Sequence, residues 1–553
     1  MAAMGFAPRD YEGRPFIGIA NSWSDFNNCN LPHKDLVEHV KRGIRQAGGV
    51  PMEFHSITTG ADFMKPSDLP YRNLMAMDIE EMIRSYPMDG VVLLCECDKT
   101  CPAQLMAVAS ANIPALQLAA GHRASGTFQG QRVTYATDFW RYLDEYMAGH
   151  LSPAEWTELE STISCSTGGC PVMGTASTMK SLSEILGMML PGTSAIPAHH
   201  ADRVSAAEAV GQRIVAMVEE NLRPSDLLTR QAVDNAIRLL GALGGSTNAL
   251  LHLTAIAGRR GITLRPADFR ELLQDVPLLV DVQPLGRYNM DDLFAAGGMP
   301  AVIGQLLSVL DTTCLTATGR SIQEEYGDAR VVDARVVRSL DAPVAQGPTL
   351  SVLSGSLAPD GAVVKSAGSG EPRLRRHLGR ALVFEGYEDM MQRIHDDKLA
   401  VDRDTVLVLR HCGPVGVPGM PEWGAIPIPQ KLLREGVRDM VRVSDARMSG
   451  TGYGTVVLHV APESAVGGPL AFVQDGDQIL LDIDAKRIDL VVAPEVLAMR
   501  RAHWQRPQAR HLRGYLKLFA DHVLQAPEGC DLDFLRPDTE SALSFVEPII
   551  GRS

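Results

Sequence analysis

Cys97, Asp98, Lys99 and Thr100 place a thiol, a carboxylate and an amine side by side, with Pro102 close behind. Thiolates favour iron–sulfur clusters or zinc, whereas carboxylates favour magnesium or manganese. Adjacent donors of both kinds therefore predict two unlike metal centres that share a pocket. Taken alone, such a string is more often a buried cysteine followed by a surface ion pair.

The segments around this string predict where it lies. An apolar run, residues 91–94, comes just before it, and a helix-like segment, residues 102–107, follows. This order is typical of the carboxyl end of a buried strand, which is where open α/β sheets bind their ligands.

The chain contains nine cysteines, and their odd number, irregular spacing and lack of an export signal argue against a disulfide framework. Reduced thiols are then packed as small hydrophobic groups or used as metal ligands. No CxxC pair is present, so a zinc ribbon or finger has no support. A zinc hydrolase also lacks the ligand spacing that it would need. Spacing alone does not identify which of the nine cysteines are metal ligands.

Loops rich in glycine recur where a small ligand would need backbone amides. Residues 166–179, which include Cys170, and residues 244–249 each lead into a helix-like segment whose free N–H groups suit an anionic oxygen or a cluster sulfide. For each segment alone, a glycine turn with a Ser/Thr cap is the commoner interpretation. Further on, Glu422 and Ser449 lie in Pro/Gly- and Gly/Ser-rich loops. Ser449 has no adjacent histidine, so it can act as a base only if metals or an oxyanion site lower its pKa.

Alternating strand-like and helix-like segments precede residue 345, and this rhythm predicts a parallel sheet with crossover helices. After it, short strand candidates separated by Gly, Pro and Asp predict a β-barrel-like domain. At 553 residues the chain is too long for a single core. We therefore predict an α/β N-terminal domain over residues 1–345 and a β-rich C-terminal domain over residues 346–553.

Composition excludes several classes of partner. The formal net charge of −14 argues against nucleic acid as a partner. No apolar stretch reaches the roughly 18 residues that span a bilayer, and the N-terminus lacks the basic start and apolar core of a secretory signal. No membrane association and a cytoplasmic location are expected.

Seven motifs together resemble the dihydroxy-acid/6-phosphogluconate dehydratase family, in its order and spacing. They are NSWSDFNNCN, YRNLMAMDIEE, DGVVLLCECDKT, GTASTM, GGSTNA, GMPEWG and SDARMSGTGYG. The resemblance covers most of the chain. It implies an α/β domain followed by a β-barrel domain, assembled as a homodimer or homotetramer.

The resemblance also implies a set of site residues. An iron–sulfur cluster, [2Fe-2S] with [4Fe-4S] as the alternative, would be held by Cys29, Cys97 and Cys170, and the other six cysteines would be bystanders. Magnesium would be held by Asp98, by a carbamylated Lys99 and by Glu422. Ser449 would be the base, and Thr451 a contact to the substrate.

One departure from the family concerns the magnesium site. Sugar-acid members carry a further acidic ligand in a Gly-Glu pair upstream of the YRN segment, but here the matching residues are Gly60 and Ala61. Asp62 follows one residue later and is expected to reach the metal only if its loop shifts.

The activity that the resemblance implies is elimination of water from a polyhydroxy acid to give a 2-keto-3-deoxy acid. GMPEWG and SDARMSGTGYG resemble the sugar-acid branch and favour a pentonate or hexonate as substrate. The alternative is the dihydroxy-acid dehydratase of branched-chain amino-acid synthesis. A non-catalytic iron–sulfur relative is a further hypothesis, which Ala61 alone supports.

Overall fold

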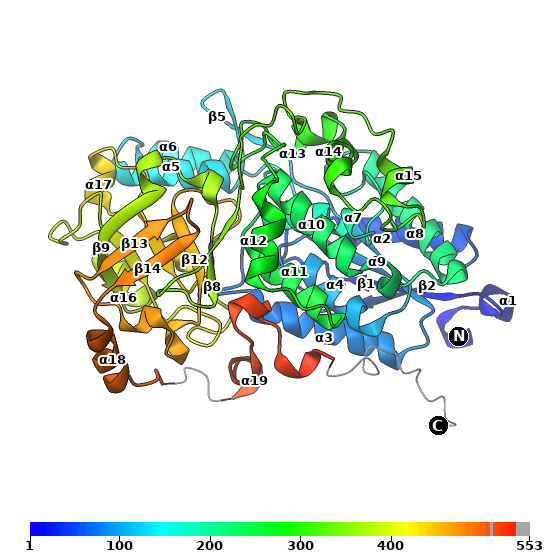
Figure 1. Ribbon diagram of the computed structural model, residues 1–553. Coiled ribbons are helices and arrows are strands. Elements are labelled where there is room, and N and C mark those ends of the chain that lie inside the picture. The colour runs from blue at the N-terminus through cyan, green and yellow to red at the C-terminus, as the bar shows by residue number, and fades with distance from the viewer. Residues whose placement is uncertain (509–512, 538–553) are drawn as a thin grey trace.

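Two main sheets organise the chain and lie on opposite sides of the molecule in the computed structural model, which describes residues 1–508 and 513–537 (Figure 1). The four-stranded N-terminal sheet has the order β2-β1-β3-β4, and every pair is parallel. Crossover helices connect its strands, which confirms the predicted α/β architecture. Its strands and first helices are β1 (Phe16–Asn21), α2 (His33–Gln46), β2 (Val50–His55), α3 (Leu69–Ser85), β3 (Gly90–Cys95), α4 (Thr100–Ala111) and β4 (Ala115–Ala119).

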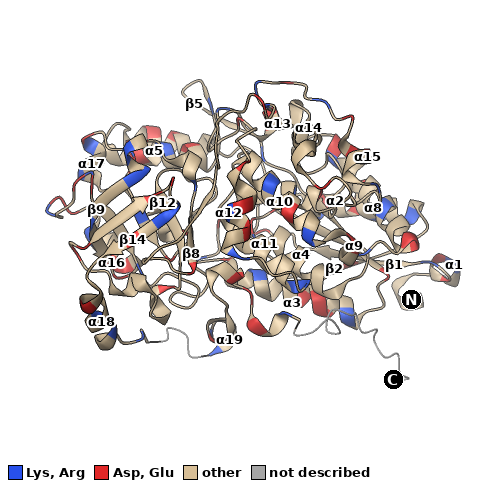
Figure 2. Cartoon of the chain, viewed as in Figure 1, with Lys and Arg blue, Asp and Glu red and all other residues tan. Residues whose placement is uncertain are grey.

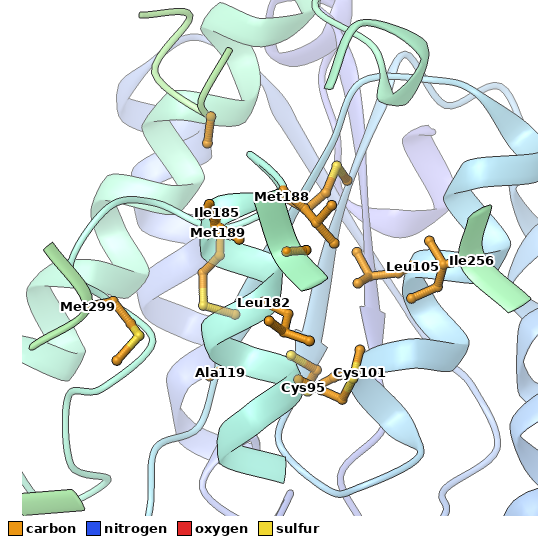
Figure 3. Packing of buried hydrophobic residues seen from close by; sticks show 14 of the residues in the cluster. Cys95, Cys101, Leu105, Ala119, Leu182, Ile185, Met188, Met189, Ile256 and Met299 are labelled. Atoms are coloured by element: carbon orange, nitrogen blue, oxygen red, sulfur yellow. The ribbon is translucent and has the colours of Figure 1, made fainter. Parts of the chain in front are cut away.

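The strand β3 is buried along its whole length, as expected for a central parallel strand covered on both faces. Cys95 at its end and Cys101 in α4 pack among apolar side chains such as Leu105 and Leu182 (Figure 3). These two cysteines therefore belong to the hydrophobic core.

Helices form most of the remaining N-terminal unit. They cover the sheet and continue the core through Leu182 and Ile185 of α7 and Ile256 of α11 (Figure 3). Their bounds are α1 (Pro8–Tyr11), α5 (Thr137–Ala148), α6 (Pro153–Thr162), α7 (Thr175–Ile185), α8 (Asp202–Glu220), α9 (Pro224–Leu227), α10 (Arg230–Leu243), α11 (Asn248–Arg259), α12 (Pro266–Gln274), α13 (Met290–Ala295), α14 (Gly298–Leu306) and α15 (Ile322–Tyr326). A small hairpin consists of β5 (Gly126–Phe128) and β6 (Gln131–Val133).

The eight-stranded second sheet has the order β14-β13-β9-β10-β11-β12-β8-β7. A parallel bridge between Ser354, just after β7, and Arg487 of β14 joins its two ends, so the sheet is a nearly closed barrel. This confirms the predicted barrel-like domain. The three central pairs, from β9 to β12, are parallel and the outer pairs are antiparallel. The strands and helices are β7 (Ser351–Leu353), β8 (Gly361–Val364), β9 (Arg376–Phe384), α16 (Tyr387–Arg393), β10 (Val406–Leu409), α17 (Gln430–Arg434), β11 (Arg442–Ser444), β12 (Val456–Ala461), β13 (Gln478–Asp482), β14 (Arg487–Val491) and α18 (Pro494–His503).

The chain then returns to the first unit. The helix α19 (Gly514–His522) and the turn after it lie beside α3 in Figure 1. Arg72 of α3 donates hydrogen bonds to the carbonyls of Gly529 and Cys530. Arg259 of α11 forms a buried ion pair with Asp531. The predicted C-terminal domain ends at residue 553, outside the described residues, and the boundary after residue 345 stays a prediction.

Charged residues of both signs are interspersed over both units (Figure 2). None of the helices in the described part of the chain is long and apolar enough to cross a membrane.

Candidate active site

Most of the predicted site residues lie in loops that follow the carboxyl ends of parallel strands in both sheets, whereas Cys170 lies in the loop between α6 and α7. Cys29 follows β1, and Cys97, Asp98 and Lys99 follow β3. In the barrel, the loop after β10 carries Glu422 and the loop after β11 carries Ser449. Because a parallel sheet gathers its carboxyl ends at one edge, residues distant in the sequence come together there. The predicted location of the Cys97 string at a strand's carboxyl end is confirmed.

The three predicted cluster cysteines lie together. The thiols of Cys29 and Cys97 form a hydrogen bond, which with burial raises the pKa of Cys97 well above its ordinary value. Desolvation raises the pKa of Cys170 as well, and the nearby Cys29 adds to that rise. Cys97 and Cys170 therefore keep their protons at neutral pH unless a metal displaces them. Asn30 connects the two loops, since it accepts a hydrogen bond from the backbone N–H of Cys97 at 3.1 Å.

Arg123 is a buried cation beside the cysteines that sequence reasoning missed. Its guanidinium lies 3.7 Å from Cys29 Sγ and 4.6 Å above the ring of Tyr135. It also donates to Asp62, which accepts a further hydrogen bond from the Tyr135 hydroxyl; both distances are 3.3 Å. Thus Asp62 faces the cysteine side, and no ion pair joins it to Lys99 in the described part of the chain.

Three carboxylates surround Lys99, whose side chain is fully buried. Its Nζ lies 3.2 Å from Asp68 Oδ1, 3.6 Å from Asp98 Oδ2 and 3.7 Å from Glu422 Oε1. Burial lowers the pKa of Lys99, but the carboxylates, Asp68 above all, outweigh it and the pKa is raised. Burial raises the pKa of Asp98 to about 6, with Glu422 and Asp68 adding to the rise and Lys99 opposing it. The structure thus brings together the predicted magnesium ligands Asp98, Lys99 and Glu422, and it places Asp68 beside them.

Arg447 and Asn248 orient Glu422. Arg447 Nη1 lies 2.9 Å from Glu422 Oε1, and the amide of Asn248 donates to the same oxygen at 3.1 Å. The amide also donates to the carbonyl of Met448 at 3.2 Å, so Asn248 joins the Glu422 loop to the Ser449 loop. Both residues belong to motifs seen in the sequence, but only the fold reveals their contacts.

Ser449 and Thr451 form a hydroxyl pair. Their oxygens are 2.8 Å apart, and Trp140 donates its indole N–H to Thr451 at 3.1 Å. Gly450, between them, packs so closely that an added Cβ would lie 2.6 Å from Ser246 Oγ. Lys365 donates to the carbonyl of Gly450 at 3.0 Å. The Ser449 turn is therefore held against the first unit's glycine-rich loop 244–249.

The donor types fit the cofactors that the sequence implies. Within the described residues, no group of three or more His, Cys, Asp or Glu side chains is arranged as a ready metal site. However, Lys99 Nζ, Asp68 Oδ2 and Asn248 Oδ1 are buried without a hydrogen-bond partner, and such orphaned groups require a further polar partner. Soft thiols on one side and hard oxygens on the other match iron–sulfur and magnesium chemistry.

Comparison with known proteins identifies the family. Residues 14–325 match the N-terminal domain of the dihydroxy-acid/6-phosphogluconate dehydratase family, and residues 335–530 match its C-terminal domain. The chain belongs to this family, which confirms the resemblance read from its motifs. It is therefore a dehydratase, a hydro-lyase.

Particular relatives cover nearly all of the chain. The 6-deoxy-6-sulfo-D-gluconate dehydratase of Pseudomonas putida is 44% identical, over 96% of this chain and 92% of the relative. The L-arabinonate dehydratase of Rhizobium leguminosarum bv. trifolii is 45% identical, over 96% and 92%. A dihydroxy-acid dehydratase from Ignicoccus hospitalis is 39% identical, over 94% and 95%.

Proposed function

We propose that this protein dehydrates a sugar acid, a pentonate or hexonate, to a 2-keto-3-deoxy acid with a [2Fe-2S] cluster and Mg²⁺. The observation that carries the proposal is that three thiols, a carboxylate-surrounded lysine and the Ser449 loop come together from the two units, which are joined by the contacts of Glu422 with Lys99 and of Asn248 with Glu422 and Met448. Higher identity to sulfogluconate and arabinonate dehydratases than to the dihydroxy-acid dehydratase supports the choice of substrate class.

The proposed ligand sets follow the donor chemistry. Cys29, Cys97 and Cys170 hold the cluster, and Asp98, Glu422 and Lys99 hold the magnesium ion. When bound, magnesium would supply stabilisation of negative charge on the substrate, and the cluster iron would supply a Lewis acid for the departing hydroxyl group. Carbamylation of Lys99 forms an N–C bond between Nζ and CO₂ with loss of two protons from the ammonium group, and this would turn a cation into an anionic oxygen ligand.

The chain's own residues then direct the elimination. Ser449, as an alkoxide, takes the proton from C2 while the C3–O bond breaks, and passing this proton to the departing hydroxide releases water and restores the alkoxide. The resulting enol tautomerises to the ketone. Thr451, held by Trp140, keeps the Ser449 oxygen in position through their hydroxyl–hydroxyl contact. Arg447 and Asn248 fix Glu422 so that the substrate's charged end meets a rigid site.

A substrate panel tests the activity. Anaerobically reconstituted enzyme with Mg²⁺ is given L-arabinonate, D-gluconate or 2,3-dihydroxyisovalerate, and the keto product is trapped and measured. We expect keto acid from at least one aldonate at a rate well above that from 2,3-dihydroxyisovalerate. Turnover of 2,3-dihydroxyisovalerate alone would favour the branched-chain alternative. A cluster-containing enzyme that dehydrates none of them would support the non-catalytic relative.

Two further expectations accompany this proposal. All nine cysteines are free thiols, which accords with the proposed cytoplasmic location. We also propose a homodimer or homotetramer, which sedimentation of the purified protein will test.

A further inference from the structure

Asp68 is a buried carboxylate, and its position before a helix does not account for its burial. It is the N-cap residue of α3, yet its side chain makes no capping hydrogen bond to that helix. Only 4% of the residue is exposed, and Oδ2 has no hydrogen-bond partner. A carboxylate in this position ordinarily caps the free N–H groups of the first turn. Here Oδ1 instead lies 3.2 Å from Lys99 Nζ.

The charges around Asp68 are not balanced. Asp68, Asp98 and Glu422 are three carboxylates that face two cations, Lys99 and Arg447. A buried charge is tolerated only when it is paired or binds a metal. If Lys99 is carbamylated, it becomes an anion and the excess of negative charge grows. A divalent cation held by oxygen ligands would correct this imbalance.

The same segment of chain lacks the acid expected of a sugar-acid dehydratase. Ala61 stands at the position where the resemblance places that ligand, and its backbone N–H forms a hydrogen bond to Cys97, next to Asp98. The methyl group of Ala61 cannot bind a metal. Asp68 follows in the loop that leads into α3 and brings a carboxylate to Lys99. The missing acid and Asp68 thus lie in one stretch of chain, which contacts Cys97 through Ala61 and Lys99 through Asp68.

We propose that Asp68 is the additional oxygen ligand of the divalent cation in this protein and replaces the acid missing at Ala61. The proposal rests on the cation site of the proposed function. It assigns Asp98, Glu422 and Asp68 as the protein carboxylates of that site, and it leaves Asp62 with Arg123. A rival role for Asp68 is only to neutralise the ammonium group of Lys99.

Binding of Mn²⁺ distinguishes the two roles without measuring turnover. The cluster-loaded enzyme is titrated with Mn²⁺, and free Mn²⁺ is measured by electron paramagnetic resonance. We expect Asp68→Asn to weaken Mn²⁺ binding at least about tenfold, with the cluster absorbance unchanged. Asp62→Asn is the matched control, an acid from the same loop, and we expect it to bind Mn²⁺ as the wild type does. Asp68→Ser provides the same comparison if the amide variant does not fold.

A rescue variant tests replacement directly. Ala61→Glu combined with Asp68→Asn is expected to recover most of the lost Mn²⁺ affinity, because the acid returns to the family position. Wild-type affinity in Asp68→Asn would overturn the assignment, and weak binding that Ala61→Glu fails to restore would overturn the replacement. A wild-type enzyme that binds no Mn²⁺ would instead overturn the cation site of the proposed function, so the two failures are distinct.

Discussion

At the scale of single residues, Ser449 carries the most specific prediction. Ser449→Ala is expected to lower kcat by about 10²- to 10⁴-fold, because it removes the proposed base for the C2 proton. The cluster spectrum is expected to remain, since the thiols come from other loops. Steady-state kinetics and the visible absorbance of the same sample check both parts. Loss of the colour together with the activity would mean that Ser449 supports the cluster rather than the proton transfer.

Lys365 gives a prediction for the pH dependence of folding stability. It is buried, and its ammonium donates to the carbonyl of Gly450 with no ion-pair partner in the described part of the chain. Burial lowers its pKa from 10.5 to about 7. Between these pKa values the unfolded chain holds a proton that the folded chain lacks, so this group makes stability rise with pH, by up to about 1.4 kcal/mol per pH unit.

Lys365→Met removes that dependence. The Tm of the wild type, relative to that of the variant, is expected to increase from pH 7 to pH 9, and to change little below pH 7, where both states hold the proton. Thermal denaturation at pH 6, 7, 8 and 9 measures the difference. A constant difference across this range would show that Lys365 stays charged in the folded protein.

At the scale of elements, the sequence predicted the strands well and some long-range contacts poorly. The apolar run at residues 91–94 corresponds to β3, because a strand buried on both faces must be apolar throughout. Asp68 was missed because an acid before a helix ordinarily predicts a cap, and nothing local indicates that it faces Lys99. Arg123 was missed for a related reason, since its partners Cys29 and Asp62 are more than 60 residues away.

The return of the C-terminal segment to the first unit is also an element-scale feature. Asp531→Asn breaks the buried pair with Arg259 and leaves that cation with Glu80, 3.3 Å away, as its remaining ion-pair partner among the described residues, which costs up to about 3–5 kcal/mol of stability. We expect a lower Tm and faster proteolysis between residues 514 and 535. The control is Asp533→Asn, which removes an exposed partner of His522 and is expected to leave the Tm nearly unchanged. Equal effects of the two variants would contradict a special role for the buried pair.

At the scale of the whole molecule, the site depends on both units. The N-terminal sheet supplies Cys97, Asp98 and Lys99, whereas the barrel supplies Glu422 and Ser449. Motif order and spacing predicted these residues, but the approach of the two sheets is a tertiary property. It depends on contacts such as that of Asn248 with both Glu422 and Met448, which no local pattern encodes.

A cation bound across the two units should therefore stabilise the whole molecule. We expect the Tm to rise with Mg²⁺ and to fall on chelation, because a ligand at 100 times its Kd stabilises the folded state by about 2.7 kcal/mol. Glu422→Gln removes the ligand that we propose the barrel supplies, and it is expected to abolish most of this Mg²⁺-dependent shift. Glu435→Gln, which changes an exposed acid of the barrel, is the control and should retain it. A full Mg²⁺ response in Glu422→Gln would show that the cation is held by the N-terminal unit alone.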